Sequence, residues 1–248
     1  MARPQSADHQ LKRDAILDAA ARCFAQMSYP AASMAAVAQA LGASKARIYH
    51  YYDSKEALLF DLLDRYTQRL LALVGESEAR AQRQSLSDRE ALHALVRSFL
   101  MEYEHSADKH VALLNDTKFL SDTVDGAGAV LVPTTALGYA EPNELHTSHA
   151  EKIQPLHQKS PQSLPQSQPP PLSQRSLIIQ RQRDIVAAVA RSLQRAYPQR
   201  MASANPVAVT MMLFGMINWT FTWLRPDGPM SYSAFADEVI QTLETGFL

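Results

Sequence analysis

Glycine and cysteine are scarce in this sequence, and no long apolar run is present. Eight glycines among 248 residues, together with many helix-forming residues, favour an all-α fold. Cys23 is the only cysteine, which excludes an intramolecular disulfide, and its place on an apolar helical stripe predicts a small buried side chain. The most apolar stretch, residues 207–224, is interrupted by three threonines and an asparagine, so it does not supply the ~18 apolar residues of a membrane span. We therefore expect a soluble cytoplasmic protein with no membrane partner.

An excess of charge of one sign is also missing. The formal net charge is -1, so nucleic-acid binding cannot be argued from the whole chain, and any basic surface must be local. Residues 1–56 hold seven Lys and Arg against five Asp and Glu, which is a small excess. The placement of the cations therefore matters more than their number.

Sequence motifs of enzymes are absent as well. No Gly-rich phosphate loop, metal-spaced Cys/His cluster or nucleophile motif occurs. Three histidines, His146, His149 and His157, lie in a proline-rich stretch where we expect no metal site. We accordingly expect a protein that is not an enzyme and that has no metal and no cofactor.

Apolar residues recur at helical spacing along most of the chain. Local signals predict several boundaries: Ser33 and Ser44 as N-caps, Gly42 as a left-handed terminator, and capping boxes formed by Asp53 with Glu56 and by Ser87 with Glu90. Asn205 followed by proline predicts a further N-cap. The expected helices cover about residues 8–27, 34–41, 45–51, 53–74, 88–103, 108–120, 174–196, 206–223 and 235–243.

The composition changes abruptly between residues 121 and 175, where eight of the 14 prolines lie. The second half of this stretch is a Pro/Gln/Ser tract without apolar periodicity, so burial cannot offset its ordering entropy. We expect a disordered insertion with patches of polyproline II, although such motifs can also recruit partner domains. The predicted organisation is an N-terminal helical domain over residues 1–55 and a second helical domain over residues 56–248, interrupted by this insertion.

The run SMAAVAQALGASKARIYHYYDSKEALL, residues 33–59, predicts two short helices joined by a tight turn, which is a helix-turn-helix. It closely resembles the DNA-binding domain of TetR-family transcriptional regulators. The residues that carry the resemblance are Ser33, Ala38, Leu41, Gly42, Ser44, Tyr49, Tyr52, Lys55 and Leu58. With the first helix, the resemblance covers about 50 residues. It implies that residues 1–55 bind a palindromic operator in double-stranded DNA, that residues 56–248 bind a ligand and form a homodimer, and that the protein is not an enzyme.

A recognition helix presents its N-terminal residues to base edges in the major groove. Arg47 can pair with guanine through two hydrogen bonds, and many relatives carry Gly-Thr where this chain has Ala46-Arg47, so their base preference cannot be transferred. Ile48 and Tyr52 are expected in the core, and Tyr51 is left open between core and DNA. The residues expected to contact DNA are Ser33, Ser44, Lys45, Ala46, Arg47, Tyr49, His50, Tyr51 and Lys55.

A second resemblance lies in the rest of the chain. Residues 113–120 (LLNDTKFL), 180–189 (QRQRDIVAAV) and 213–231 (LFGMINWTFTWLRPDGPMS) are similar to regulators of aromatic-acid, steroid or fatty-acid degradation. This resemblance implies an acyl-coenzyme A thioester as effector. The candidate ligand-binding residues are Tyr103, Phe214, Asn218, Trp219, Phe221 and Trp223, with plain core and dimer packing as the equally weighted alternative.

The sequence therefore predicts a homodimeric, ligand-responsive repressor of a catabolic operon. One alternative is a repressor of an efflux or stress operon that senses a hydrophobic drug-like compound. The other, from a different class, is a protein-interaction module that acts through the proline-rich insertion.

Overall fold

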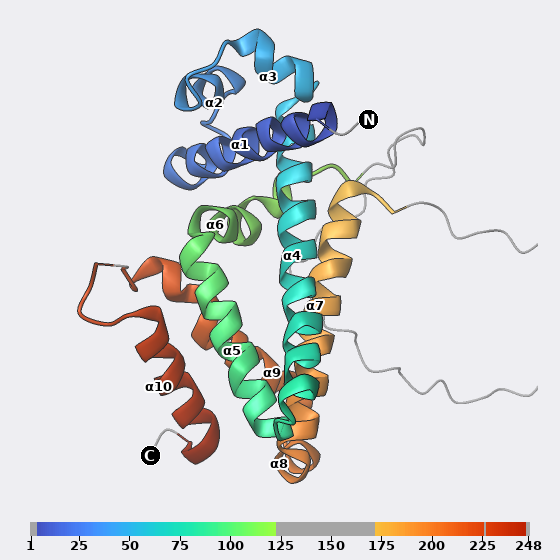
Figure 1. Ribbon diagram of the computed structural model, residues 1–248, viewed down its shortest axis with the longest axis vertical. Coiled ribbons are helices and arrows are strands. Elements are labelled where there is room, and N and C mark those ends of the chain that lie inside the picture. Colours follow the sequence, from blue (N-terminus) through green and yellow to red (C-terminus); the bar gives the residue numbers. More distant parts are fainter. Residues whose placement is uncertain (1–3, 123–171, 226, 247–248) are drawn as a thin grey trace, which may run out of the picture.

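The computed structural model describes residues 4–122, 172–225 and 227–246, and the expected all-α fold is confirmed for them. No strand occurs in these three ranges. The elements, labelled in Figure 1, are α1 (Pro4–Met27), α2 (Met34–Ala40), α3 (Lys45–Tyr51), α4 (Lys55–Gln84), α5 (Asp88–His105), α6 (Ala107–Asp116), η1 (Thr117–Phe119), α7 (Gln174–Ala196), α8 (Pro198–Ser203), α9 (Pro206–Asn218), η2 (Trp219–Thr222) and α10 (Tyr232–Thr245). No helix of these ranges has the length and apolarity needed to cross a membrane.

The long helix α4 is the axis of the molecule (Figure 1). Helices α1, α2 and α3 lie at its N-terminal end, and α5 and α7 pack along the remainder. Helix α6 lies between the two parts, because it packs on α1 as well as on α4. Helix α10 covers α5, and α9 packs against α7. The head formed by α1–α3 is therefore joined to the helical body through α4 and α6.

One continuous apolar core runs through the head and the body. In α4, Leu58, Leu59, Leu62 and Leu63 are at most 1% exposed and belong to this core, and α4 packs on α1 of the head as well as on α5, α6 and α7. Burying a leucine contributes roughly 1.5–3 kcal/mol relative to leaving it in water. The first two turns of α4 thus hold the head on the body mainly by apolar packing.

Most predicted helix starts are confirmed. Ser33 and Ser44 cap α2 and α3, Ser87 forms the capping box with Glu90, and Asn205 accepts hydrogen bonds at the start of α9. The capping box predicted from Asp53 and Glu56 is wrong.

The N-cap of α4 is Ser54, which has extended backbone angles and whose Oγ accepts a hydrogen bond from the Ala57 N–H at 3.0 Å. Glu56 does not reach back to the cap, because its Oε1 accepts a hydrogen bond from the Ser121 N–H at 2.6 Å. The carboxylate is therefore used in a contact between segments that are distant in sequence.

Three helix ends differ from the prediction. Helix α4 continues ten residues past residue 74, since Val74, Ser77 and Ala81 extend its buried stripe. The helix predicted over residues 206–223 ends at Asn218, and Trp219–Thr222 is a 3-10 helix. Helix α6 ends at Asp116, where the prediction ran to residue 120. The short helix α8 was not predicted.

The predicted insertion falls on residues that the structure does not describe, 123–171, but both of its flanks are described. Its last two predicted residues, Gln174 and Arg175, already belong to α7. The Arg175 N–H donates to the Ser121 carbonyl at 3.3 Å, and the Arg175 guanidinium pairs with Asp122 at 2.7 Å. The two flanks therefore lie side by side.

Candidate nucleic-acid interface and effector region

The turn between α2 and α3 has the conformation that the sequence predicts. Gly42 has φ +65°, in the left-handed region that favours glycine, and its N–H donates to the Gln39 carbonyl at 3.0 Å. A Cβ at this position would meet no heavy atom within 4 Å, so the need for glycine comes from the backbone angle alone. The Ser44 Oγ then accepts from the Arg47 N–H at 3.3 Å and starts α3.

Helix α3 has one buried and one exposed face. Ile48 is 0% exposed and Tyr52, its C-cap residue, is 4% exposed, which agrees with the expected core positions. Tyr51 is half-buried and its ring lies 4.8 Å from that of His9. The exposed face consists of Ser44, Lys45, Ala46, Arg47, Tyr49 and His50, all of them sequence-predicted DNA contacts.

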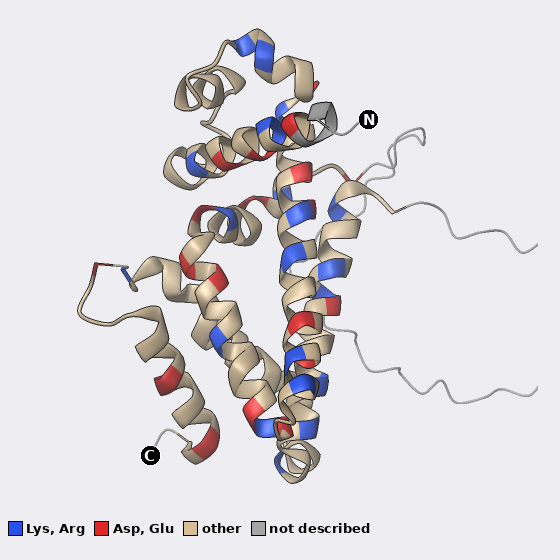
Figure 2. Cartoon of the chain, in the orientation of Figure 1, with Lys and Arg blue, Asp and Glu red and all other residues tan. Residues whose placement is uncertain are grey.

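The exposed face is also free of negative charge. Residues 34–51 hold Lys45 and Arg47 and no carboxylate, and Figure 2 shows the two cations at the start of α3. Lys45 lies 5.6 Å from the ring centroid of Tyr49. Neither cation forms an ion pair with any residue that the structure describes. Ser33, at the start of α2, is exposed, and its Oγ accepts from the Ala36 N–H.

Lys55, also among the predicted DNA contacts, forms its hydrogen bonds within the chain. Its Nζ donates to the carbonyl oxygens of Tyr29 and Ala32, both at 2.8 Å, and to that of Pro30 at 3.4 Å. It also lies 4.3 Å from the centroid of the Tyr29 ring. An ammonium has three donors, and all three are used inside the chain, so Lys55 ties the α1–α2 connection to α4 and has no donor left for a phosphate.

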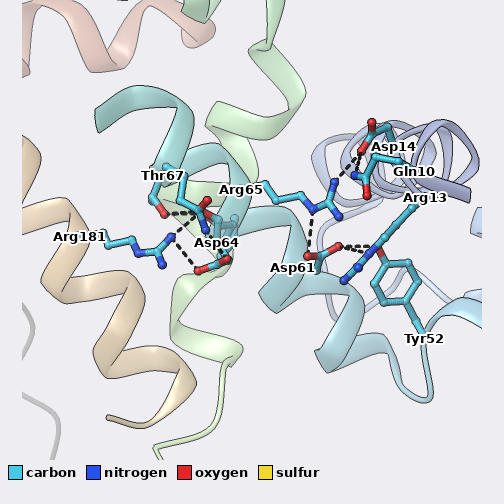
Figure 3. A network of polar contacts seen from close by, with 11 residues as sticks. Gln10, Arg13, Asp14, Tyr52, Asp61, Asp64, Arg65, Thr67 and Arg181 are labelled. Atoms are coloured by element: carbon cyan, nitrogen blue, oxygen red, sulfur yellow. Dashed lines mark hydrogen bonds and ion pairs between the residues drawn. The ribbon is translucent and has the colours of Figure 1, made fainter. Parts of the chain in front are cut away.

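A polar network that the sequence did not reveal joins the head to α4 (Figure 3). Asp61 of α4 accepts hydrogen bonds from the Tyr52 hydroxyl at 2.5 Å and from Arg13 Nε of α1 at 3.0 Å. Arg65 Nε donates to Asp61 at 3.0 Å, and its Nη1 pairs with Asp14 of α1 at 2.6 Å. The spacing of Asp61 and Arg65 is visible in the sequence as an i,i+4 pair, but their partners in α1 are about 50 residues away.

The same turn of α4 also contacts α7. Arg181 Nη1 pairs with the Asp64 carboxylate at 2.8 Å and donates to the Asp64 backbone carbonyl at 3.0 Å. In Figure 3, Asp61 and Arg65 point toward α1 and Tyr52, whereas Asp64 points toward Arg181. This turn therefore has ionic contacts on two sides.

Only some of the predicted ligand-binding residues come together. Tyr103 of α5 is 3% exposed and its hydroxyl donates to Asn218 Oδ1 at 3.1 Å. Phe214 is 5% exposed and its ring packs edge-on against Phe99 at 6.4 Å. Phe221 is half-buried. Trp219 and Trp223 are 58% and 49% exposed, and the Trp219 ring stacks on Phe221 at 5.8 Å.

His110 of α6 lies between Tyr103, Asn218 and Tyr66, and the sequence did not identify it. Its Nε2 is 3.2 Å from the Asn218 carbonyl oxygen, and its Nδ1 is 3.4 Å from the Tyr66 hydroxyl. A carbonyl can only accept, so Nε2 carries the proton and Nδ1 accepts from Tyr66. The ring stacks on Tyr103 at 3.8 Å. Burial lowers the pKa of His110 to about 4, so the imidazole is neutral at pH 7.

Helix α6 and the 3-10 helix η1 that follows it also contact the head directly. Lys109 pairs with Asp18 of α1 at 2.8 Å, and the ring of Phe119 stacks on Tyr29 at 5.2 Å. The Asp116 side chain is 3% exposed, and burial raises its pKa to about 6 although the Tyr29 backbone N–H donates to it. The aromatic side chains around His110 are thus connected to the head through α6, which carries His110 and packs on α1.

An open groove of about 830 Å³ lies between α4 and α5. Charged side chains of both signs line it, among them Arg69, Arg97 and Glu102. None of the predicted ligand-binding residues belongs to this groove.

Comparison with known proteins gives matches in both halves of the chain. The family model "Bacterial regulatory proteins, tetR family" matches residues 16–62, and "Tetracyclin repressor-like, C-terminal domain" matches residues 167–247. An HTH-type transcriptional repressor of Mycobacterium tuberculosis is 41% identical over 71 residues, which is 28% of this chain and 38% of that protein. The matched region spans 30–38% of the length of the curated relatives.

Solved structures match over nearly the whole chain. A TetR-family transcriptional regulator from Bordetella parapertussis is 29% identical, with 95% of each chain covered and a TM-score of 0.66. The structure of AibR in complex with isovaleryl coenzyme A and operator DNA is 20% identical, covers 93% of this chain and 96% of that one, and has a TM-score of 0.62. At 20% identity, the match to AibR shows that the two chains share a fold and does not show a shared ligand.

Proposed function

Since the chain belongs to the tetR family of bacterial regulatory proteins, we propose that it is a DNA-binding transcriptional repressor that a small effector releases from its operator. Its relatives are transcriptional regulators and not enzymes, as the sequence led us to expect. We assign DNA binding to residues 1–55, and effector binding and dimerisation to residues 56–248.

The observation that carries this proposal is the exposed face of α3. Lys45, Arg47, Tyr49 and His50 point away from the core on a helix whose other face is held by Ile48 and Tyr52. Side chains at the start of such a helix reach base edges in the major groove. Arg47 has no ion-pair partner in the described ranges that would have to be displaced first. We assign base readout to Arg47 and phosphate or base contacts to Ser33, Ser44, Lys45, Ala46, Tyr49, His50 and Tyr51.

This assignment can be tested by selecting duplexes from randomised double-stranded DNA. The protein is then titrated with the selected duplex and with a scrambled duplex of the same composition. Arg47→Ala should lower affinity for the selected duplex by about ten-fold, within the ~1–3 kcal/mol that a bidentate contact to guanine supplies. Arg83→Ala is the matched control, because Arg83 is an exposed arginine in the last turn of α4. Equal effects of the two substitutions would contradict the base-reading role of Arg47.

We further propose that the effector is an acyl-coenzyme A thioester and that the repressor controls a catabolic operon. Support comes from the fold shared with AibR, whose structure holds isovaleryl coenzyme A together with operator DNA. Within this chain, Tyr103, Asn218 and Phe221 of the proposed ligand site adjoin His110. A thioester or amide bound there would take over hydrogen bonds that these polar groups now make to one another. Helix α6 carries His110 and packs on α1. A ligand that displaces His110 would therefore shift the contacts between α6 and the head.

Thermal unfolding in the presence of candidate compounds distinguishes the effector classes, because a ligand of the folded state raises the midpoint. Acyl-coenzyme A thioesters should raise it, while free apolar compounds should not. The reverse pattern would favour the alternative of an efflux or stress repressor that senses drug-like molecules.

We also propose that the repressor is a homodimer that binds a palindromic operator. Several large apolar side chains of α9, of η2 and of the residue after η2 are exposed in a single chain, namely Val207, Met211, Met212, Trp219 and Trp223. A second copy could cover them and place two heads about one helical turn of DNA apart. The alternative of an interaction module rests on residues 123–171, outside the described residues, and it predicts that no duplex is selected.

A further inference from the structure

The Asp61 carboxylate holds three side chains from three segments of the chain. Its Oδ2 accepts from the Tyr52 hydroxyl at 2.5 Å and from Arg13 Nε at 3.0 Å, and its Oδ1 accepts from Arg65 Nε at 3.0 Å. The Asp61 side chain is only 14% exposed. Arrangements of this kind, with ionised acceptors and partial burial, are stronger and more specific than surface ion pairs.

Tyr52 is the member of this group that acts on the recognition helix α3. It is the C-cap residue of α3, and its N–H donates to the Ile48 carbonyl at 3.0 Å. Its hydroxyl is held from both sides, because it donates to Asp61 and accepts from Arg13 Nε at 3.2 Å. Burial, aided by the Asp61 carboxylate, raises the pKa of Tyr52, so the phenol keeps the proton that it donates.

Few other contacts fix α3 with respect to α4. Helix α3 packs chiefly on α2, whereas α1 packs on both α2 and α4. Arg13 and Asp14 of α1 belong to the same network, since Arg65 bridges Asp61 and Asp14 (Figure 3). Asp61 is therefore the one acceptor in the described residues that receives hydrogen bonds from α1, from the end of α3 and from α4 itself.

We propose that Asp61 is a positioning residue for operator recognition: through Tyr52 and Arg13 it fixes the orientation of α3 relative to α1 and α4 without touching DNA. This inference rests on the proposed function. Hydrogen bonds to base edges tolerate only small displacements of a side chain, whereas non-specific attraction to phosphates depends on charge and tolerates more. Loss of Asp61 should therefore reduce discrimination between sequences more than it reduces binding as such.

Asp64 offers a matched control on the same helix turn. Its side chain is 19% exposed, close to the 14% of Asp61, and it also forms an ion pair with an arginine. That arginine is Arg181 of α7, so Asp64 points away from the head (Figure 3). The substitutions Asp61→Asn and Asp64→Asn remove one carboxylate charge each, from sites of similar burial, but Asp61 contacts α1 and Tyr52 whereas Asp64 contacts α7.

The experiment uses the full chain and the duplex that the wild-type protein selects, with the scrambled duplex of the same composition for comparison. Asp61→Asn should weaken binding to the selected duplex by about ten-fold while the scrambled duplex changes by less than about two-fold. Asp64→Asn should leave both within about two-fold. Thermal unfolding of each variant checks that both remain folded at the assay temperature.

Tyr52→Phe keeps the buried ring and removes only the hydroxyl, so it tests the same link when Asp61→Asn does not fold. Like Asp61→Asn, it should weaken binding to the selected duplex more than binding to the scrambled duplex. If the two residues act through one another, Tyr52→Phe combined with Asp61→Asn should bind no worse than Asp61→Asn alone, because effects within one network are not additive.

Three results would overturn the inference: equal weakening of both duplexes by Asp61→Asn, an equal loss of discrimination in Asp64→Asn, or additive losses in the double variant. Failure of the wild-type chain to select any duplex is a different result, and it would contradict the proposed function itself.

Discussion

At the scale of single residues, Lys45 and Lys55 differ in what their ammonium groups contact. The Lys55 ammonium is bonded to three backbone carbonyls, while that of Lys45 lies on the exposed face of α3 beside a tyrosine ring. Lys55→Met should lower the free energy of unfolding by about 1–3 kcal/mol, because it removes hydrogen bonds from a charged donor to backbone carbonyls. Chemical denaturation measures this effect.

Whereas Lys55→Met should affect stability, Lys45→Met should affect DNA binding and leave stability unchanged. It should leave stability within about 0.5 kcal/mol of the wild type and reduce the slope of log K against log salt by about 0.9 for each phosphate that the lysine neutralises. A reduced salt slope in Lys55→Met, with unchanged stability, would instead show that Lys55 binds a phosphate.

His110 gives the chain a pH dependence of known sign. Its pKa is about 4 in the folded chain against about 6.5 when unfolded, so between these values the unfolded chain binds a proton that the folded chain does not. The stability that comes from the neutral imidazole is complete above pH 6.5 and is lost as the pH falls toward 4. This loss amounts to at most about 3 kcal/mol.

Chemical denaturation of wild type and His110→Gln from pH 7 to pH 4 measures it. The stability difference between the two chains should change across this window in favour of the variant. Asp116, whose pKa burial raises to about 6, acts in the opposite sense but is common to both chains and so cancels in the comparison. A difference that stays constant with pH would contradict the buried, neutral state of His110.

At the scale of elements, the start of α4 distinguishes two candidate caps that are adjacent in sequence. Ser54 accepts the hydrogen bond from Ala57, whereas Asp53 is exposed and lies outside the helix. Ser54→Ala should cost about 1 kcal/mol of unfolding free energy, and Asp53→Ala should cost less than about 0.5 kcal/mol. Equal losses measured by denaturation would mean that Asp53 contributes to the cap.

The elements that the sequence predicted well are those with local signals. Caps, the left-handed glycine and apolar spacing lie within a few residues of the helices they define, and α2 and α3 were placed almost without error. The length of α4 depends on packing against α7, and the contacts of Lys55, Asp61 and His110 join residues 9 to 108 positions apart. Local patterns carry no information on such partners. The exposed face of α3 and its buried residues Ile48 and Tyr52 were therefore predictable, while the polar partners of Tyr52 were not.

At the scale of the whole molecule, the exposed apolar surface of α9 and η2 predicts self-association. Met212 is 64% exposed there, and Met212→Glu would place a charge in the proposed dimer interface. The wild-type chain should sediment as a dimer at micromolar concentration and Met212→Glu largely as a monomer. Met101→Glu is the control, because Met101 is 43% exposed on α5. Dissociation by both substitutions, or by neither, would contradict the assigned interface.

The contact between Ser121, Asp122 and Arg175 has a consequence for protein engineering. The chain leaves and re-enters the described fold at one point on its surface, beside the start of α4, because Glu56 bonds to Ser121. A fluorescent domain spliced between residues 122 and 172 would therefore need no long linkers and would sit next to the helix that joins head and body. Such a fusion could report effector binding as a change in emission.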